Sequence, residues 1–320
     1  MYRASSLLLP LFVSGLITQV SAQTPASSPQ PEIFAPGVIS GPDNDGAPTF
    51  SPDGNTLFFT RSTAHWTVIL ESHRSASEWS KPKLASFSGV WPDSSPAMSP
   101  DGSYIVFQST RPASEAKPGE PAPPKVSNLW RVDRVGDGWS EPKRLPNTVN
   151  IGHSIWKPSI AADGTIYLTV IDDKGGKRLY SAAYEGGSYQ MAHPLSFSDG
   201  TTADVDPEIA PDGSFLVFCS SGRMKGDDKD HLFITRRAGK DWGPVTQIRY
   251  AGDEKPYGFS ADDEPRLGPD HRTLYFSSDR AAVVHFPRTH EQAEEDLTRL
   301  ELWDKSNSNV WSISLTSWLS

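Results

Sequence analysis

The sequence has one cysteine, Cys219, in 320 residues. An intrachain disulfide is therefore excluded, and a buried core has to hold the fold together. Cys219 lies in the apolar run FLVFCSSGR, where related runs of the chain carry Gln108 or Ser277. We interpret it as a small strand residue and not as a catalytic thiol.

Clusters of lysine and arginine are also missing, and the formal net charge is −9. Proteins that bind nucleic acid use clustered positive charge to neutralise phosphates. A nucleic-acid partner is therefore not expected.

Long apolar runs are confined to the N-terminus. Arg3 precedes a mostly apolar stretch over 7–20, and Val20-Ser21-Ala22 offers a small-residue cleavage site. This pattern predicts a signal peptide over 1–22, a disordered tail over 23–31 and a periplasmic or secreted protein. The alternative is that the stretch is a buried element of the fold. No later run approaches the roughly 20 apolar residues of a membrane-spanning helix, so no span is expected.

Local catalytic motifs are absent as well. The chain has no G-x-S-x-G elbow and no H-E-x-x-H motif, and its eight histidines are scattered. These absences exclude the enzyme classes that such motifs mark. They do not exclude an enzyme whose acidic residues come from distant segments, because that arrangement leaves no local motif.

The sequence does contain a repeat built on the turn Ser-Pro-Asp-Gly. Its copies are Ser51–Gly54, Ser99–Gly102, Ala161–Gly164, Ala210–Gly213 and Gly268–His271. Successive copies are 48 to 62 residues apart, a proline precedes each by three residues, and an apolar run rich in β-formers follows. Proline, aspartate and glycine favour a tight turn, so each copy predicts a β-hairpin.

A second hairpin follows in most repeats, and its last strand carries an aromatic residue. These residues are Trp79, Trp139, Tyr189 and Trp242. Four short antiparallel strands per repeat are typical of a propeller blade. Insertions at 112–126, 224–230 and 281–301 lengthen the repeats, and 290–303 is expected to form a short helix with Leu297, Leu300 and Trp303 along one side. This helix would cap the channel or cover the exposed end of the last blade.

The last repeat lacks its final strand, and the segment 32–40 before the first repeat resembles the missing piece. A strand from the N-terminus would close the ring and remove two exposed sheet edges. The sequence therefore predicts an all-β protein, with 32–320 forming one five-bladed β-propeller. Six blades remain the alternative.

The string D-x-x-P-x-x-S-P-D-G-x-x-L-x-F-x-S-x-R resembles the propeller repeat of TolB-like proteins, a WD-like family common among exported bacterial proteins. The resemblance covers nearly all of residues 32–320. It implies the propeller fold. It implies little about activity, because the family includes periplasmic scaffolds and propeller domains of peptidases.

The candidate site residues lie at the two ends of this string, which meet at one face of the disc. They are Asp45, Asp93, Asp204, Asp262, Glu264, Arg61, Arg111, Arg223 and Arg280. Blade three lacks both the aspartate, where Ile155 stands, and the arginine. This joint loss favours ion pairs that close each blade. In the alternative, the carboxylates converge on the channel mouth, with Asp43, Asp206 and Asp263, and hold Ca²⁺ or a polar ligand.

The leading functional hypothesis is a non-enzymatic binding or scaffold propeller of the bacterial envelope. It would be a monomer without an obligatory cofactor and would recognise a protein, peptide or glycan at the channel mouth. Two alternatives stay open, namely a propeller glycosidase or lyase with acidic residues in the central funnel, and a propeller that gates a separate hydrolase.

Overall fold

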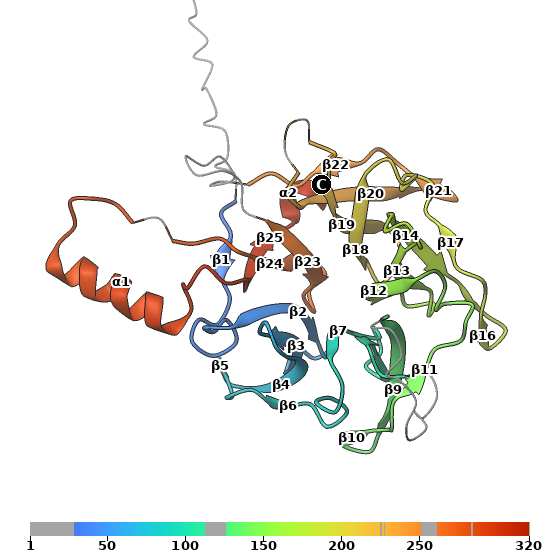
Figure 1. Ribbon diagram of the computed structural model, residues 1–320, viewed down its shortest axis with the longest axis horizontal. Coiled ribbons are helices and arrows are strands. Elements are labelled where there is room, and N and C mark those ends of the chain that lie inside the picture. The colour runs from blue at the N-terminus through green and yellow to red at the C-terminus, as the bar shows by residue number, and fades with distance from the viewer. Residues whose placement is uncertain are drawn as a thin grey trace, which may run out of the picture.

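The computed structural model describes residues 29–112, 126–224, 226, 228–250, 261–282 and 284–319. The signal peptide expected over 1–22, the tail up to residue 28 and nearly all of the insertion 112–126 lie outside these residues. The described strands form five antiparallel sheets arranged around a central axis (Figure 1). Each sheet is one blade, and the fold is the predicted five-bladed β-propeller.

Blade one shows how the repeat builds a sheet. Its four strands are β2 (Asn44–Phe50), β3 (Thr56–Ser62), β4 (Thr67–Ser75) and β6 (Lys83–Leu84), with β5 (Glu78–Trp79) in the hairpin between the last two. In the turn after β2, Oγ of Ser51 donates to Asp53 (2.5 Å) and accepts from the amide of Thr56 (2.9 Å). Gly54 supplies the left-handed residue that the turn requires, with φ of 71°.

The next three blades repeat this order. Blade two contains β7 (Asp93–Met98), β8 (Tyr104–Ser109), β9 (Asn128–Val135), β10 (Gly138–Trp139) and β11 (Lys143–Arg144). Blade three contains β12 (Ser154–Ile160), β13 (Ile166–Ile171), β14 (Lys177–Ala182) and β17 (His193–Pro194), beside the hairpin β15 (Tyr184–Glu185) and β16 (Ser188–Tyr189). Blade four contains β18 (Ala203–Ile209), β19 (Phe215–Ser221), β20 (His231–Ala238), β21 (Asp241–Trp242) and β22 (Thr246–Gln247).

Blade five is completed by the N-terminal strand, as the sequence predicts. Its order is β1 (Glu32–Ile33), β25 (Asn309–Ser314), β24 (Thr273–Ser278) and β23 (Asp262–Leu267). Glu32 lies opposite Ser312, and the amide of Phe34 donates to the carbonyl of Val310 (2.9 Å). The ring is therefore closed by hydrogen bonds between distant parts of the chain.

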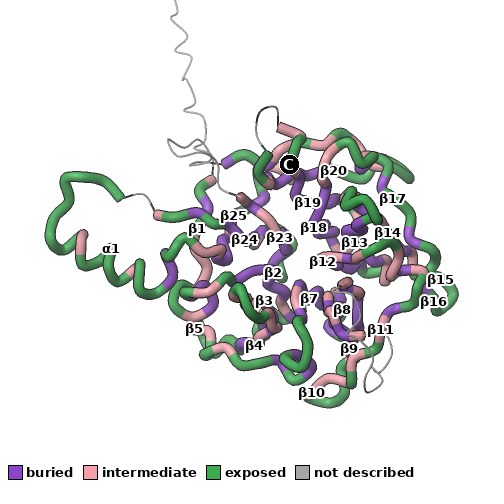
Figure 2. Tube along the Cα trace, viewed as in Figure 1, coloured by how far each residue is buried: buried purple, intermediate pink, exposed green. Residues whose placement is uncertain are grey.

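The hydrophobic core lies between neighbouring blades and not at the axis. Five clusters of buried residues fill the five interfaces between adjacent blades. Figure 2 shows that the inner strands are largely buried while the outer loops are exposed. Cys219 is fully buried in the cluster between blades four and five, as its interpretation as a strand residue requires.

The helix expected over 290–303 is present as α1 (His290–Leu302), but it has neither of the expected roles. It extends sideways beyond blade five instead of covering the channel (Figure 1). None of its residues is buried, and Leu297 and Leu300 are exposed, so it does not cover a blade end either. A short helix, α2 (Thr316–Leu319), ends the described chain. No helix among the described residues is long and apolar enough to cross a membrane.

Candidate functional site in the central channel

The predicted Asp and Arg residues form four ion pairs, one in each blade except blade three. The nitrogen–oxygen distances are 2.6 Å for Arg61 to Asp45, 2.8 Å for Arg111 to Asp93, 2.7 Å for Arg223 to Asp204 and 3.3 Å for Arg280 to Asp262. All four carboxylates are buried. Arg61 and Arg223 bind their aspartates through both Nε and Nη2, which is the bidentate geometry of a strong ion pair.

These pairs join the inner strand of a blade to the end of its second strand. Three of the arginines also donate to a backbone carbonyl, of Ile39, Phe87 or Phe197. Arg280 instead contacts the hydroxyl of Tyr250, which in turn donates to Asp262. The carboxylates thus already have cationic partners, so a role for these eight residues in ligand binding stays a prediction. As paired groups, they do not offer the free acid and base that a glycoside hydrolase needs.

Glu264 is placed differently, because it belongs to a ring of five residues at the axis. Each member precedes the proline of an inner strand and has a left-handed backbone: Ala47, Ser95, Lys157, Asp206 and Glu264, with φ between 47° and 56°. Every inner strand has a register shift at this point, as expected for a proline that cannot join the ladder.

Hydrogen bonds between blades hold this ring. The amide of Ser95 donates to Oγ1 of Thr60 (2.8 Å), and the amide of Asp206 donates to Oγ1 of Thr169 (2.9 Å). In both cases the acceptor lies on the second strand of the preceding blade. The unusual backbone is therefore part of the joint between blades, and the side chains of the ring are free to differ.

The charged members of the ring meet across the channel mouth. Lys157 of blade three forms an ion pair with Glu264 of blade five, although blade four lies between them. Oγ of Ser277 donates to the other oxygen of Glu264 (2.6 Å), and the amide of Glu264 donates to Asp206 (3.2 Å). A Cβ at Gly46 would collide with the Glu264 carboxylate and the Ser277 hydroxyl, so any other residue there would require these two side chains to move.

Two further carboxylates surround this group. Burial, which outweighs the opposing charge of Lys157, raises the pKa of Asp263 to about 7, and Asp206 and Asp230 add to the rise. Burial also raises the pKa of Asp230. The mouth is thus a half-buried acidic surface, with Lys157 as the cation at its centre and Lys177 acting on Asp230. No group of three His, Cys, Asp or Glu side chains among the described residues is arranged to hold a metal ion, so nothing here supports a Ca²⁺ site.

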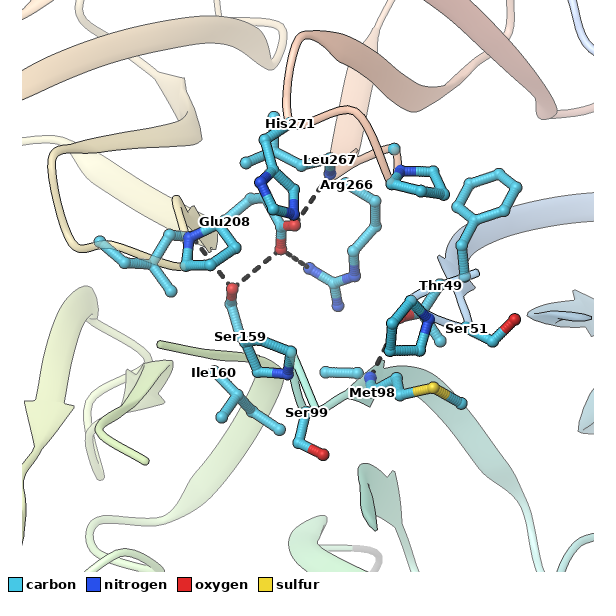
Figure 3. A pocket seen from close by; sticks show the side chains of 18 residues that line it. Thr49, Ser51, Met98, Ser99, Ser159, Ile160, Glu208, Arg266, Leu267 and His271 are labelled. Carbon is cyan, nitrogen blue, oxygen red and sulfur yellow. Dashed lines mark hydrogen bonds and ion pairs between the residues drawn. The ribbon is translucent and has the colours of Figure 1, made fainter. Parts of the chain in front are cut away.

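The opposite end of the channel, which the SPDG turns surround, holds a buried ion pair that sequence reasoning missed (Figure 3). Glu208 accepts from Arg266 (3.3 Å), from Oγ of Ser159 (2.9 Å) and from the amide of Leu267 (2.8 Å). Arg266 is 2% exposed and lines a cavity of about 180 Å³. Burial raises the pKa of Glu208, against the influence of Arg266.

A signal for this pair exists in the repeat. The residue after the inner-strand proline is small in three blades, namely Thr49, Ala97 and Ser159, and charged in blades four and five. Thr49 and Ser159 accept hydrogen bonds from amides of the next blade, at 3.0 Å each, and Glu208 does the same. An alignment of the five repeats at this position would have shown that Glu208 and Arg266 depart from the pattern.

TolB proteins of two bacteria are among the solved structures that are similar to this chain. A protein assigned to TolB from Agrobacterium tumefaciens aligns with 77% of this chain and 74% of its own length, at 20% identity and a TM-score of 0.49. TolB from Acinetobacter baumannii aligns with 85% of this chain and 54% of its own length, at 15% identity and a TM-score of 0.47. This chain thus spans about half the length of the second protein.

The solved structure of an enzyme is about as similar to this chain as the two TolB structures are. An α-L-arabinofuranosidase from Podospora anserina aligns with 90% of this chain and 96% of its own length, at 12% identity and a TM-score of 0.51. The likeness shows the fold alone. Propellers carry many unrelated functions, so function has to be argued from the site. No protein-family model matches the chain, and no curated protein matches its sequence.

Proposed function

We propose that this protein is a non-enzymatic binding propeller of the bacterial cell envelope, which holds a basic peptide segment of a partner protein at the D-x-x-P mouth of its channel. The envelope location rests on the signal-like sequence of residues 1–22. The observation that carries the binding role is the ion pair between Lys157 and Glu264, which crosses the mouth between non-adjacent blades.

The charge of the mouth supports a cationic ligand. Asp206, Asp230, Asp263 and Glu264 surround one central cation, Lys157. A lysine or arginine side chain of a partner can replace Lys157 as the ion-pair partner of Glu264. Charged groups that converge in a low-dielectric opening attract ligands of opposite charge and raise the association rate.

Isothermal titration calorimetry with a hexalysine peptide tests this proposal, with hexaglutamate and a muropeptide as comparison ligands. We expect hexalysine alone to bind, and its affinity to fall as salt is raised. Lys157→Met removes the internal competitor and should tighten binding about fivefold, whereas Glu264→Gln should weaken it by a similar factor.

Glu301→Gln provides a matched control, because Glu301 is an exposed acid of α1 away from the channel. It should leave the affinity for hexalysine unchanged. Equal losses in Glu264→Gln and Glu301→Gln would mean that the peptide senses only the net charge of the protein. Binding of the muropeptide in preference to hexalysine would contradict a basic peptide ligand.

A further inference from the structure

The SPDG end of the channel departs from the repeat at three positions that line one cavity. Glu208 and Arg266 replace the small residues of the other inner strands, and His271 stands where the other four turns have glycine. All three residues line the cavity of about 180 Å³. Because the other blades close the same kind of ring with small residues or glycine at these positions, the fold itself does not require charged groups there.

His271 adds an energetic cost to this departure. It has φ of 53°, a left-handed conformation that glycine adopts freely and that other residues adopt at a cost of about 1 kcal/mol or more. Figure 3 shows His271 among the residues that line the cavity. Residues in strained backbone conformations cluster at functional sites, so His271 is a candidate for a binding role.

Arg266 has unused hydrogen-bonding capacity in this cavity. Its Nη1 makes two long contacts, to the carbonyl of Pro265 (3.2 Å) and to Glu208 (3.3 Å). Its Nε and Nη2 have no hydrogen-bond partner among the described residues and are closed off from solvent. A buried guanidinium with two unpaired donors is destabilising, since each lost hydrogen bond costs about 1–3 kcal/mol.

The other blades show what this edge of an arginine binds. Arg61 and Arg223 use the same two nitrogens, Nε and Nη2, to hold both oxygens of a carboxylate at 2.6 to 3.1 Å. Glu208 does not serve Arg266 in this way, because it contacts only Nη1 of the guanidinium, at 3.3 Å. The Nε–Nη2 edge of Arg266 therefore matches a second carboxylate.

The rest of the cavity wall contains polar residues, among them Thr49, Ser51 and Ser99, and a set of apolar ones. Phe50, Met98, Ile160, Ile209 and Leu267 line it together with the prolines of four SPDG turns. A cavity of about 150 Å³ is large enough for benzene, so 180 Å³ suits a ligand about the size of benzoate. The nearby charge of Glu208 disfavours an anion with two or more charges.

We propose that this cavity binds a monocarboxylate with a short apolar tail, and that its carboxylate pairs with the Nε–Nη2 edge of Arg266. The guanidinium turns away from its two long contacts to present this edge, and the tail packs among the apolar side chains. The site lies at the opposite end of the channel from the acidic mouth. It does not depend on the function proposed there.

Isothermal titration calorimetry of the full chain with benzoate, and with benzamide as the neutral analogue, tests the proposal. We expect benzoate to bind and benzamide not to bind. Arg266→Met should weaken benzoate binding at least about tenfold, because it removes the bidentate partner and keeps an apolar chain of similar length. Glu208→Gln should tighten benzoate binding several-fold, because it removes the competing negative charge.

Lys157→Met is the matched control, since it removes one positive charge from the other end of the channel. It should leave benzoate binding unchanged while altering the affinity for hexalysine, so the two proposals can fail separately. If circular dichroism shows that Arg266→Met does not fold, the wild type and Glu208→Gln decide. Absence of benzoate binding up to about 20 mM, equal binding of benzamide, or weaker benzoate binding by Glu208→Gln would overturn the proposal.

Discussion

At the scale of residues, the ion pair of Asp204 with Arg223 illustrates what the four pairs do for stability. The Asp204 side chain is fully buried, whereas that of Arg223 is 20% exposed. Removing the arginine leaves a buried charge without its cation, while removing the aspartate leaves a cation that can reach water.

We therefore expect Arg223→Met to cost about 3 kcal/mol of unfolding free energy and Asp204→Asn clearly less. Urea unfolding of both variants and of the double variant measures this difference, and the double variant should cost less than the sum of the two single losses. Glu294→Gln breaks an exposed pair with His290 and should change nothing measurable. Equal losses for the two single variants would contradict the argument from burial.

Asp263 gives a prediction with a definite sign in pH. Its pKa is raised to about 7 by burial, with the carboxylates of Asp206 and Asp230 adding to the rise, against about 3.9 in an unfolded chain. The folded protein therefore holds this proton more tightly, and stability falls as the pH rises from 4 to 7. Asp263→Asn removes this loss. We expect the variant to be about 1–3 kcal/mol more stable than the wild type at pH 8 and nearly equal at pH 4, measured by urea unfolding.

The matched control for Asp263 is Asp53→Asn. Asp53 is exposed, and hydrogen bonds from Ser51 and Asn55 lower its pKa, so its variant should show the opposite trend, with a relative loss of stability at neutral pH. A stability difference between Asp263→Asn and the wild type that does not vary with pH would rule out the raised pKa.

At the scale of elements, the strand β1 closes the ring with two residues and the aromatic side chain of Phe34 that follows. The ring of Phe34 packs edge to face against Tyr275 of blade five and Trp79 of blade one. The ring centroids are 4.9 Å and 6.0 Å apart, respectively. It thus joins the last blade to the first.

We expect Phe34→Ala to cost about 2–3 kcal/mol, since it removes a partly buried aromatic ring from this joint. Phe286→Ala is the control, because Phe286 is 77% exposed and should leave stability unchanged. Urea unfolding compares the two variants. If Phe34→Ala were as stable as the control, backbone hydrogen bonds alone would hold β1 in place.

The elements also show what a sequence can and cannot reveal about such a fold. The SPDG turns and the segment at 32–40 predicted five blades and their closure, because tight turns and strand patterns are local properties of the chain. The helix at 290–302 was predicted as an element, but its position was not, because no sequence pattern fixes where an unburied helix points. The pair of Glu208 and Arg266 was missed because its partners are 58 residues apart and meet only when blades four and five pack against each other.

At the scale of the whole molecule, the charged residues of the channel are distributed unequally among the blades. Blades one and two contribute only uncharged residues at the positions before and after the inner-strand proline, namely Ala47, Thr49, Ser95 and Ala97. The charged residues at these positions come from blades three to five. Equivalent hydrogen bonds from a backbone amide to a side-chain hydroxyl of the preceding blade join blade one to blade two and blade three to blade four, irrespective of this difference. These hydrogen bonds between blades recur at both joints, whereas the side chains inside the channel differ and make its two ends chemically different.

Because hydrogen bonds join neighbouring blades, we expect the blades to unfold cooperatively. Cys219 is fully buried between blades four and five, and burial raises the pKa of its thiol, so it should react with Ellman's reagent only when the molecule unfolds. Phe34→Ala weakens the closure on the far side of blade five. If the ring opens as one unit and recloses faster than the reagent reacts, the variant should raise the labelling rate of Cys219 by the factor that corresponds to its loss of unfolding free energy, about tenfold for each 1.4 kcal/mol. Labelling at the wild-type rate in a destabilised variant would show instead that blade five opens alone while the interface with blade four stays closed.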